Sequence, residues 1–209
     1  MASLCRNFVP AVLQTIDQLR LFIALPTPEA IKDALAKAQS ELRRAVPNGE
    51  IRWTRPEQFH LTLRFLGNVS DSKVEELKLV IQAACGQFAP LKLTAAGIGF
   101  FPPKRAPRVI WAGVAEPGGH LVSLWKAVDL ATQPFSPEKG EEHFAAHITL
   151  ARVNRLGRKE ADALMKESER FERTIFGEWT VRQVELMRSE LSSQGARHSL
   201  LAALPLGGG

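Results

Sequence analysis

Two short segments of the sequence combine an imidazole and a hydroxyl at the same spacing. Residues 60–63 read HLTL and residues 147–150 read HITL, and the second segment begins 87 residues after the first (147 minus 60). An imidazole titrates near pH 6.5, so one of two facing histidines can accept a proton while the other donates one. A threonine two residues later on a strand projects from the same face and can hydrogen-bond a phosphoryl oxygen. The two segments therefore indicate metal-free, in-line displacement at phosphorus.

One such segment alone carries little information, because a histidine beside a core is often only a hydrogen-bonded polar group. Here both copies fall on alternating apolar patterns that predict strands, and each precedes a charged helix. This repetition favours an internal duplication with one His-Thr pair in each lobe.

The elements that position these residues alternate between strands and helices. Apolar patterns predict strands at residues 19–25, 51–53, 60–66, 91–97, 108–114, 147–152, 180–189 and 198–204. Helical spacing predicts helices at residues 28–44, 71–87, 118–131 and 159–170. No glycine-rich phosphate loop accompanies them, so we expect an antiparallel α+β fold rather than a nucleotide-binding unit of the P-loop or Rossmann type.

Composition excludes disordered, collagen-like and coiled-coil classes. The chain has 209 residues, 45% hydrophobic and 23% charged, with a formal net charge of +5 and a sequence pI near 9.5. This balance favours an anionic ligand, although many ordinary enzymes share it. We predict an N-terminal extension at residues 1–18, one domain at 19–206 and a flexible tail at 207–209.

Cys5 and Cys85 lie far apart, without the spacing of a metal site or the density of a disulfide scaffold. No apolar run reaches about 18 residues and no signal peptide is recognisable. We therefore expect a cytoplasmic protein without a membrane segment.

A zinc site is the main alternative for the second histidine. His143 and His147 are four residues apart, as in the zinc-binding helix of a metalloprotease, but Phe144 stands where that motif needs Glu. The strand pattern at His147 also argues against a helix, so we predict no metal and no cofactor.

The two segments, with their surroundings, resemble the two-histidine (2H) phosphoesterases that carry the HXTX motif. Within that superfamily the similarity is greatest to the LigT-like RNA 2',3'-cyclic phosphodiesterases, also called 2'-5' RNA ligases, and it extends from about residue 19 to 204. The stretches that carry it are residues 22–26 (FIALP), 52–67 (RWTRPEQFHLTLRFLG), 108–114 (RVIWAGV) and 189–191 (SEL).

The resemblance implies a bilobal, pseudo-twofold fold in which two antiparallel sheets, flanked by helices, surround a central cleft. It implies that His60 protonates the leaving 3' oxygen and His147 activates water, which leaves a 2'-phosphomonoester on RNA. Thr62 and Thr149 would hold the phosphate. Arg152 matches a family position that contacts the phosphate, with a solvated arginine at a strand end as the alternative. Reversible 2'-5' ligation would be a further activity, and a monomer is the default because one chain already encloses the cleft.

Two positions depart from the family pattern. Ala146 replaces the proline that commonly precedes the second motif, and His198 stands where a tyrosine is common. His198 could shape a base pocket or pack in the interior, and packing is the interpretation we favour.

Aromatic and basic residues supply further candidates. Core packing is favoured over base stacking for Trp111 and Trp125, whereas Phe100 and Phe101 are candidates for the rim of the cleft. A basic rim for RNA could form from Arg55, Arg64, Lys104, Arg105 and Arg108, although a solvated polar face explains most of them equally well. Two other functions remain open: a phosphoesterase acting on another cyclic or 2'-5'-linked small nucleotide, and a non-catalytic RNA-binding module.

Overall fold

The computed structural model describes residues 17–103, 107–140, 142–192 and 195–207. The strands are β1 (Gln18–Pro26), β2 (Glu50–Trp53), β3 (His60–Ser70), β4 (Leu91–Phe101), β5 (Val109–Ala115), β6 (His147–Arg155), β7 (Ile175–Val181), β8 (Gln183–Ser192) and β9 (Gly195–Pro205). The α-helices are α1 (Glu29–Ala45), α2 (Val74–Cys85), α3 (His120–Thr132) and α4 (Arg158–Glu169), and three short 3-10 turns are η1 (Pro56–Gln58), η2 (Asp71–Lys73) and η3 (Gln133–Phe135).

The strands form one curled antiparallel sheet that is narrow at its middle. Its order is β7-β4-β5-β6-β3-β1-β8-β9, with β2 added beside β6. At the middle, β3 and β6 pair through one residue pair only, Leu61 with Ile148. The sheet thus divides into a first half (β3, β1, β8, β9) and a second half (β6, β5, β4, β7, β2). The bilobal antiparallel α+β fold is as expected, but the two expected sheets are the two halves of one continuous sheet.

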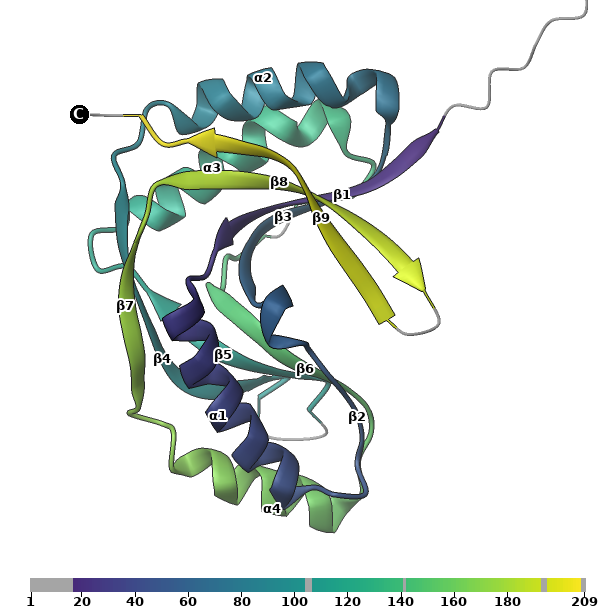
Figure 1. The fold of residues 1–209 in the computed structure, drawn as a ribbon, viewed down its shortest axis with the longest axis vertical. Helices are drawn as coiled ribbons and strands as arrows, with labels where there is room; N and C mark the ends of the chain where they lie inside the picture. The colour runs from purple at the N-terminus through teal and green to yellow at the C-terminus, as the bar shows by residue number, and fades with distance from the viewer. Residues whose placement is uncertain (1–16, 104–106, 141, 193–194, 208–209) are drawn as a thin grey trace, which may run out of the picture.

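Each half-sheet is covered by two helices. Helices α2 and α3 pack on the first half and α1 and α4 on the second, and Figure 1 shows the two pairs at opposite ends of the molecule. Helix α1 follows β1 in the chain but packs on β7, and α3 follows β5 but packs on β3. Each lobe is therefore built from both halves of the sequence, an exchange of helices that the duplicated pattern did not reveal.

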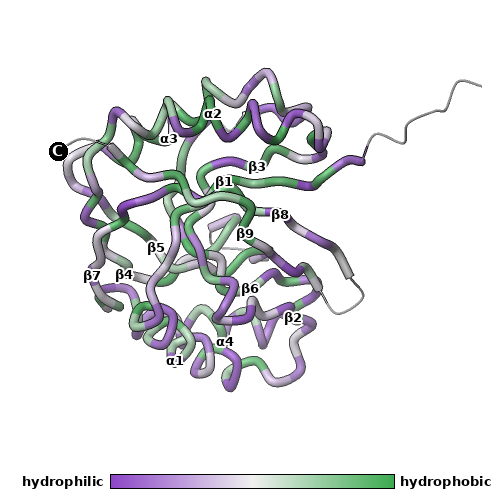
Figure 2. The backbone as a smooth tube through the Cα atoms, turned by 45° about the horizontal axis from the view of Figure 1, so that its top comes forward, coloured by the Kyte–Doolittle hydropathy of each residue, from purple (hydrophilic) through white to green (hydrophobic). Residues whose placement is uncertain are grey.

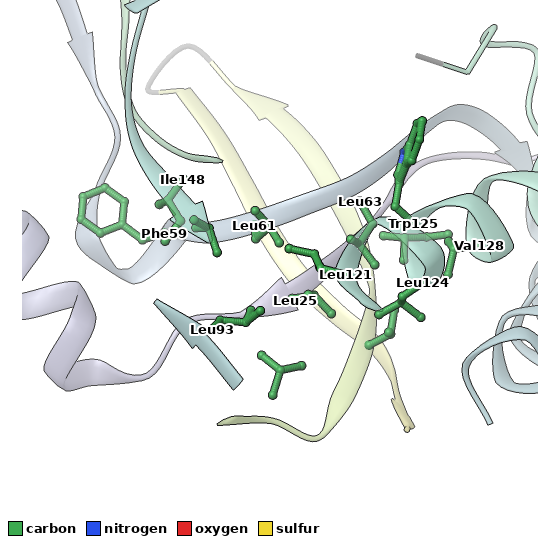
Figure 3. Packing of buried hydrophobic residues seen from close by; sticks show 14 of the residues in the cluster. Leu25, Phe59, Leu61, Leu63, Leu93, Leu121, Leu124, Trp125, Val128 and Ile148 are labelled. Atoms are coloured by element: carbon green, nitrogen blue, oxygen red, sulfur yellow. The ribbon is translucent and has the colours of Figure 1, made fainter. Parts of the chain in front are cut away.

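Buried apolar residues hold the two His-bearing strands together. Leu61 and Ile148, at the narrow middle of the sheet, are completely buried, and Phe59 packs beside them (Figure 3). Leu63, further along β3, lies near Leu121 of α3 in the same view. Hydrophobic stretches are concentrated in the central strands, whereas hydrophobic and hydrophilic residues alternate along the helices (Figure 2). The alternation that buries one face of β3 and β6 leaves His60 and His147 on the other.

Several predicted boundaries need correction. The predicted strand at residues 180–189 is two strands, because β7 ends at Val181, and β8 begins at Gln183 in the other half of the sheet. Strand β1 begins at Gln18, inside the predicted extension, whose residues 1–16 lie outside the described part of the chain. No helix in the described ranges is long and apolar enough to cross a membrane.

Candidate active site

The two predicted His-Thr pairs lie at two adjoining cavities between the half-sheets. The first cavity, the His60 pocket, has a volume of about 440 Å³ and is lined by His60. The second, the His147 pocket, has a volume of about 250 Å³ and is lined by His147. Both pockets share four lining residues: Thr62, Phe65, Thr149 and Arg152. All five residues that the sequence predicted for the site therefore line one composite cleft.

Both imidazoles are oriented by the same backbone contact. The Nδ1 of His60 lies 2.7 Å from the carbonyl oxygen of Gln58, and the Nδ1 of His147 lies 2.7 Å from that of Ala145. A carbonyl oxygen can only accept, so Nδ1 carries the proton in each ring and Nε2 is left as the reactive nitrogen. In neutral His60 this Nε2 accepts a hydrogen bond from the Thr62 hydroxyl at 3.0 Å.

The surroundings of His60 disfavour its charged form. The pKa of His60 is lowered from 6.5 to about 4, mainly by burial and in part by the nearby imidazoles of His198 and His147, and the hydrogen bond to Gln58 opposes this shift. His60 is therefore neutral at pH 7, with an unprotonated Nε2.

His198 lies inside the site. Its ring meets that of His60 edge-on at 5.4 Å between centroids and that of Phe22 at 4.8 Å, and it lines the His60 pocket. Its Nδ1 is buried and has no hydrogen-bond partner among the described residues. Burial lowers the pKa of His198. This histidine packs, as favoured from the sequence, but it packs against a predicted catalytic ring.

Aromatic side chains also flank His147. Phe101 meets it edge-on at 5.2 Å, which fits the predicted position at the rim, and Trp111 lies 6.4 Å away. Trp125 is in the hydrophobic core as predicted. The same prediction is not confirmed for Trp111, which lies opposite Thr149 in the sheet, is partly buried, and belongs neither to the hydrophobic core nor to the lining of either pocket.

A β-bulge in each His-bearing strand brings one more residue to the cleft. Residues 63–64 are both buried, as are residues 150–151, and the pairing register shifts at both places. The bulge turns the fifth residue after each histidine back to the face of that histidine. That residue is Phe65 in β3 and Arg152 in β6, and both are exposed.

The basic lining of the cleft differs from the predicted rim. Arg20, Arg52, Arg55 and Arg152 line the His60 pocket. Arg64 lines the His147 pocket but is buried, and its guanidinium pairs with Asp129 and donates to the Glu138 carbonyl. Arg108 lines neither described pocket, and Lys104 and Arg105 lie outside the described residues.

The sequence missed Arg20, Arg52, Gln58 and Phe65. Arg52 was detectable only through its pairing with β6, and Phe65 only through the bulge. A signal did exist for Gln58, since it lies two residues before a candidate catalytic histidine. No group of three or more His, Cys, Asp or Glu in the described ranges is placed to hold a metal ion.

Comparison with known proteins gives one consistent result. Residues 25–111 match the family model described as LigT like Phosphoesterase. An Aquifex aeolicus protein named RNA 2',3'-cyclic phosphodiesterase is 28% identical over 91% of this chain and 98% of its own length. An Archaeoglobus fulgidus protein of the same name is 31% identical over 85% of this chain and 94% of its own length.

A crystal structure of a Thermus thermophilus protein superposes with a TM-score of 0.75 at 28% identity, covering 91% of this chain and 99% of that one. Sequence and fold agree over nearly the full length of these relatives. The chain belongs to the LigT-like phosphoesterase family.

Proposed function

We propose that this phosphoesterase hydrolyses 2',3'-cyclic phosphate ends of RNA to 2'-phosphomonoesters. The observation that carries the proposal is the matched placement of His60 with Thr62 and His147 with Thr149 on the two strands that border one cleft. The name RNA 2',3'-cyclic phosphodiesterase, carried by relatives that match most of the chain, supports it.

The reaction needs one base and one acid on opposite sides of the phosphorus. The Nε2 of His147 takes a proton from water as the water oxygen bonds to phosphorus. The bond from phosphorus to the 3' oxygen breaks, and that oxygen takes the proton from Nε2 of His60. The phosphate remains on the 2' oxygen. Thr62, Thr149 and Arg152 donate hydrogen bonds to the non-bridging oxygens, where charge increases in the transition state.

The low pKa of His60 fits this role once substrate is present. A bound phosphate diester carries a negative charge, which favours the imidazolium and raises the pKa of His60. Protonation at Nε2 also ends the hydrogen bond that Nε2 accepts from Thr62. The Thr62 hydroxyl then becomes available to the phosphate at the moment when His60 becomes an acid.

The test is product analysis on an oligonucleotide with a 2',3'-cyclic phosphate end. We expect a 2'-phosphate product, activity that survives a chelator, and a loss of about 10²–10⁴-fold in kcat for both His60→Ala and His147→Ala. His143→Ala is the matched control, because His143 is exposed and lines neither pocket. Full activity of either pocket variant would refute the assignment, and a 3'-phosphate product would reverse the geometry.

The same assay separates the alternatives. Faster turnover of a small cyclic or 2'-5'-linked nucleotide than of RNA ends would favour a phosphoesterase of small nucleotides. RNA binding that survives both substitutions, without turnover, would favour a binding module. Because a 5'-hydroxyl can attack phosphorus in place of water while the 3' oxygen leaves, joining of a 2',3'-cyclic end to a 5'-hydroxyl end would reveal 2'-5' ligation. We further propose a cytoplasmic monomer, which sedimentation and cell fractionation would test.

A further inference from the structure

The His60 pocket contains more positive charge than one cyclic phosphate needs. Four arginines line it, no Asp or Glu lines it, and within the described ranges none of the four forms an ion pair: Arg20, Arg52, Arg55 and Arg152. A cyclic phosphate diester carries one negative charge. A pocket with four uncompensated guanidinium groups is therefore suited to a ligand with at least two phosphates.

Two of these arginines lie directly opposite each other. Arg52 of β2 and Arg152 of β6 are register partners in the antiparallel pair, which are neighbouring strands in Figure 1. Directly opposite residues have Cβ atoms about 5 Å apart, and like charges in such pairs are destabilising. A bound anion between the two side chains removes this repulsion, and a guanidinium matches the geometry of phosphate oxygens.

The pairing that places Arg52 opposite Arg152 is fixed by buried hydrogen bonds. The backbone N–H of Thr54 donates to the carbonyl of Leu150 at 2.9 Å. The buried side chain of Gln39, from α1, donates to the carbonyls of both Thr54 and Leu150 at 2.8 Å. Strand β2 is thus held against β6 at this register, which keeps Arg52 and Arg152 directly opposite each other across the two strands.

Arg52 lines only the His60 pocket, whereas Arg152 lines both pockets. If His60 protonates the leaving 3' oxygen, the ribose of the cyclic nucleotide lies on the His60 side. In RNA the 5' oxygen of that ribose carries the next phosphate. We propose that Arg52, beside Arg152, binds the phosphate on the 5' oxygen of the cyclic-phosphate nucleotide, and that the enzyme prefers substrates that carry this phosphate. The inference rests on the proposed function and specifies its substrate.

The experiment compares two small substrates: a nucleoside 2',3'-cyclic phosphate with a 5'-hydroxyl, and the same compound with a 5'-phosphate. One charge-assisted hydrogen bond is worth enough for the wild-type kcat/KM to be about tenfold or more higher with the 5'-phosphate. In Arg52→Gln this ratio should fall towards one. Arg155→Gln is the matched control, since it removes the same charge from β6 at a residue that lines neither pocket, and it should keep the wild-type ratio.

Each remaining outcome is decisive. Equal losses on both substrates in Arg52→Gln would mean that Arg52 serves the cyclic phosphate itself, which overturns the inference. A wild-type enzyme that opens both substrates equally well also overturns it, while the proposed function stands. A wild-type enzyme that opens neither small substrate but opens the 2',3'-cyclic end of an oligonucleotide overturns the inference alone, because the 5'-phosphate is then not sufficient for recognition. Failure on the oligonucleotide as well refutes the proposed function, and the inference fails with it.

Discussion

The two histidines of the cleft have the same Nδ1 contact but different neighbours. His60 lies beside Phe22 and His198, and His147 lies beside Phe101 and Trp111. Burial and two nearby imidazoles keep His60 neutral in the empty site. In the proposed mechanism His60 is the general acid and must carry a proton, so the negative charge of the substrate has to stabilise its protonated form. That mechanism therefore couples substrate binding to proton uptake at this residue.

This coupling can be measured on the ring itself. In an NMR titration of the empty enzyme we expect His60 to protonate with a midpoint near pH 4. Saturating inorganic phosphate should move the midpoint upward, because the bound anion favours the imidazolium. His198→Phe keeps an aromatic ring and removes one source of positive charge, so it should also raise the midpoint. A midpoint near 6.5 in the empty wild-type enzyme, unchanged by phosphate, would contradict this account.

At the scale of elements, much of the site could be predicted and some of it could not. The His-x-Thr spacing places both residues on one strand face, because side chains alternate along a strand. The same alternation puts residue 151 on that face, whereas the bulge in β6 buries it and turns Arg152 outward. Arg52 depends on which strand pairs with β6. Bulges and pairing are set by long-range contacts, which a local pattern does not record.

The link between β3 and α3 is a second feature of this scale. Arg64 and Asp129 form an ion pair with side chains 4% and 17% exposed. Asp129→Asn leaves the guanidinium without its counter-charge, so we expect the free energy of unfolding in urea at pH 7 to fall by about 3 kcal/mol. Glu178→Gln, which breaks the exposed pair with Lys92, is the control and should change little. Equal effects of the two substitutions would show that the Arg64 pair is not a stabilising link.

At the scale of the whole molecule, the chain crosses between the lobes several times. Helices α1 and α3 each pack on the lobe opposite to the strand that precedes them, and β7 and β8 lie in different half-sheets on either side of Arg182. Neither lobe can form without residues from both halves of the sequence. The cleft between the lobes therefore depends on the complete fold, and ionisation of its buried residues affects the stability of the entire molecule.

The pH dependence of stability follows from the buried imidazoles. The pKa of His60 is about 4 in the folded protein and 6.5 without burial, so between these values the unfolded chain binds more protons. The free energy of unfolding should then decrease as pH falls from 6.5 towards 4, by up to about 1.4 kcal/mol per pH unit for each such proton. Burial of His198 acts in the same direction.

Urea unfolding between pH 7.5 and 5 checks this expectation, because the carboxylates whose pKa values are lowered, Glu116 and Glu178, titrate at more acidic pH. His60→Asn should reduce the slope of the free energy of unfolding against pH, since the protein then lacks the group that resists protonation in the folded state. His143→Asn, at an exposed position outside both pockets, should retain the wild-type slope. If His60→Asn leaves this slope unchanged, the fold does not hold His60 neutral, and protonation of His60 does not require bound substrate.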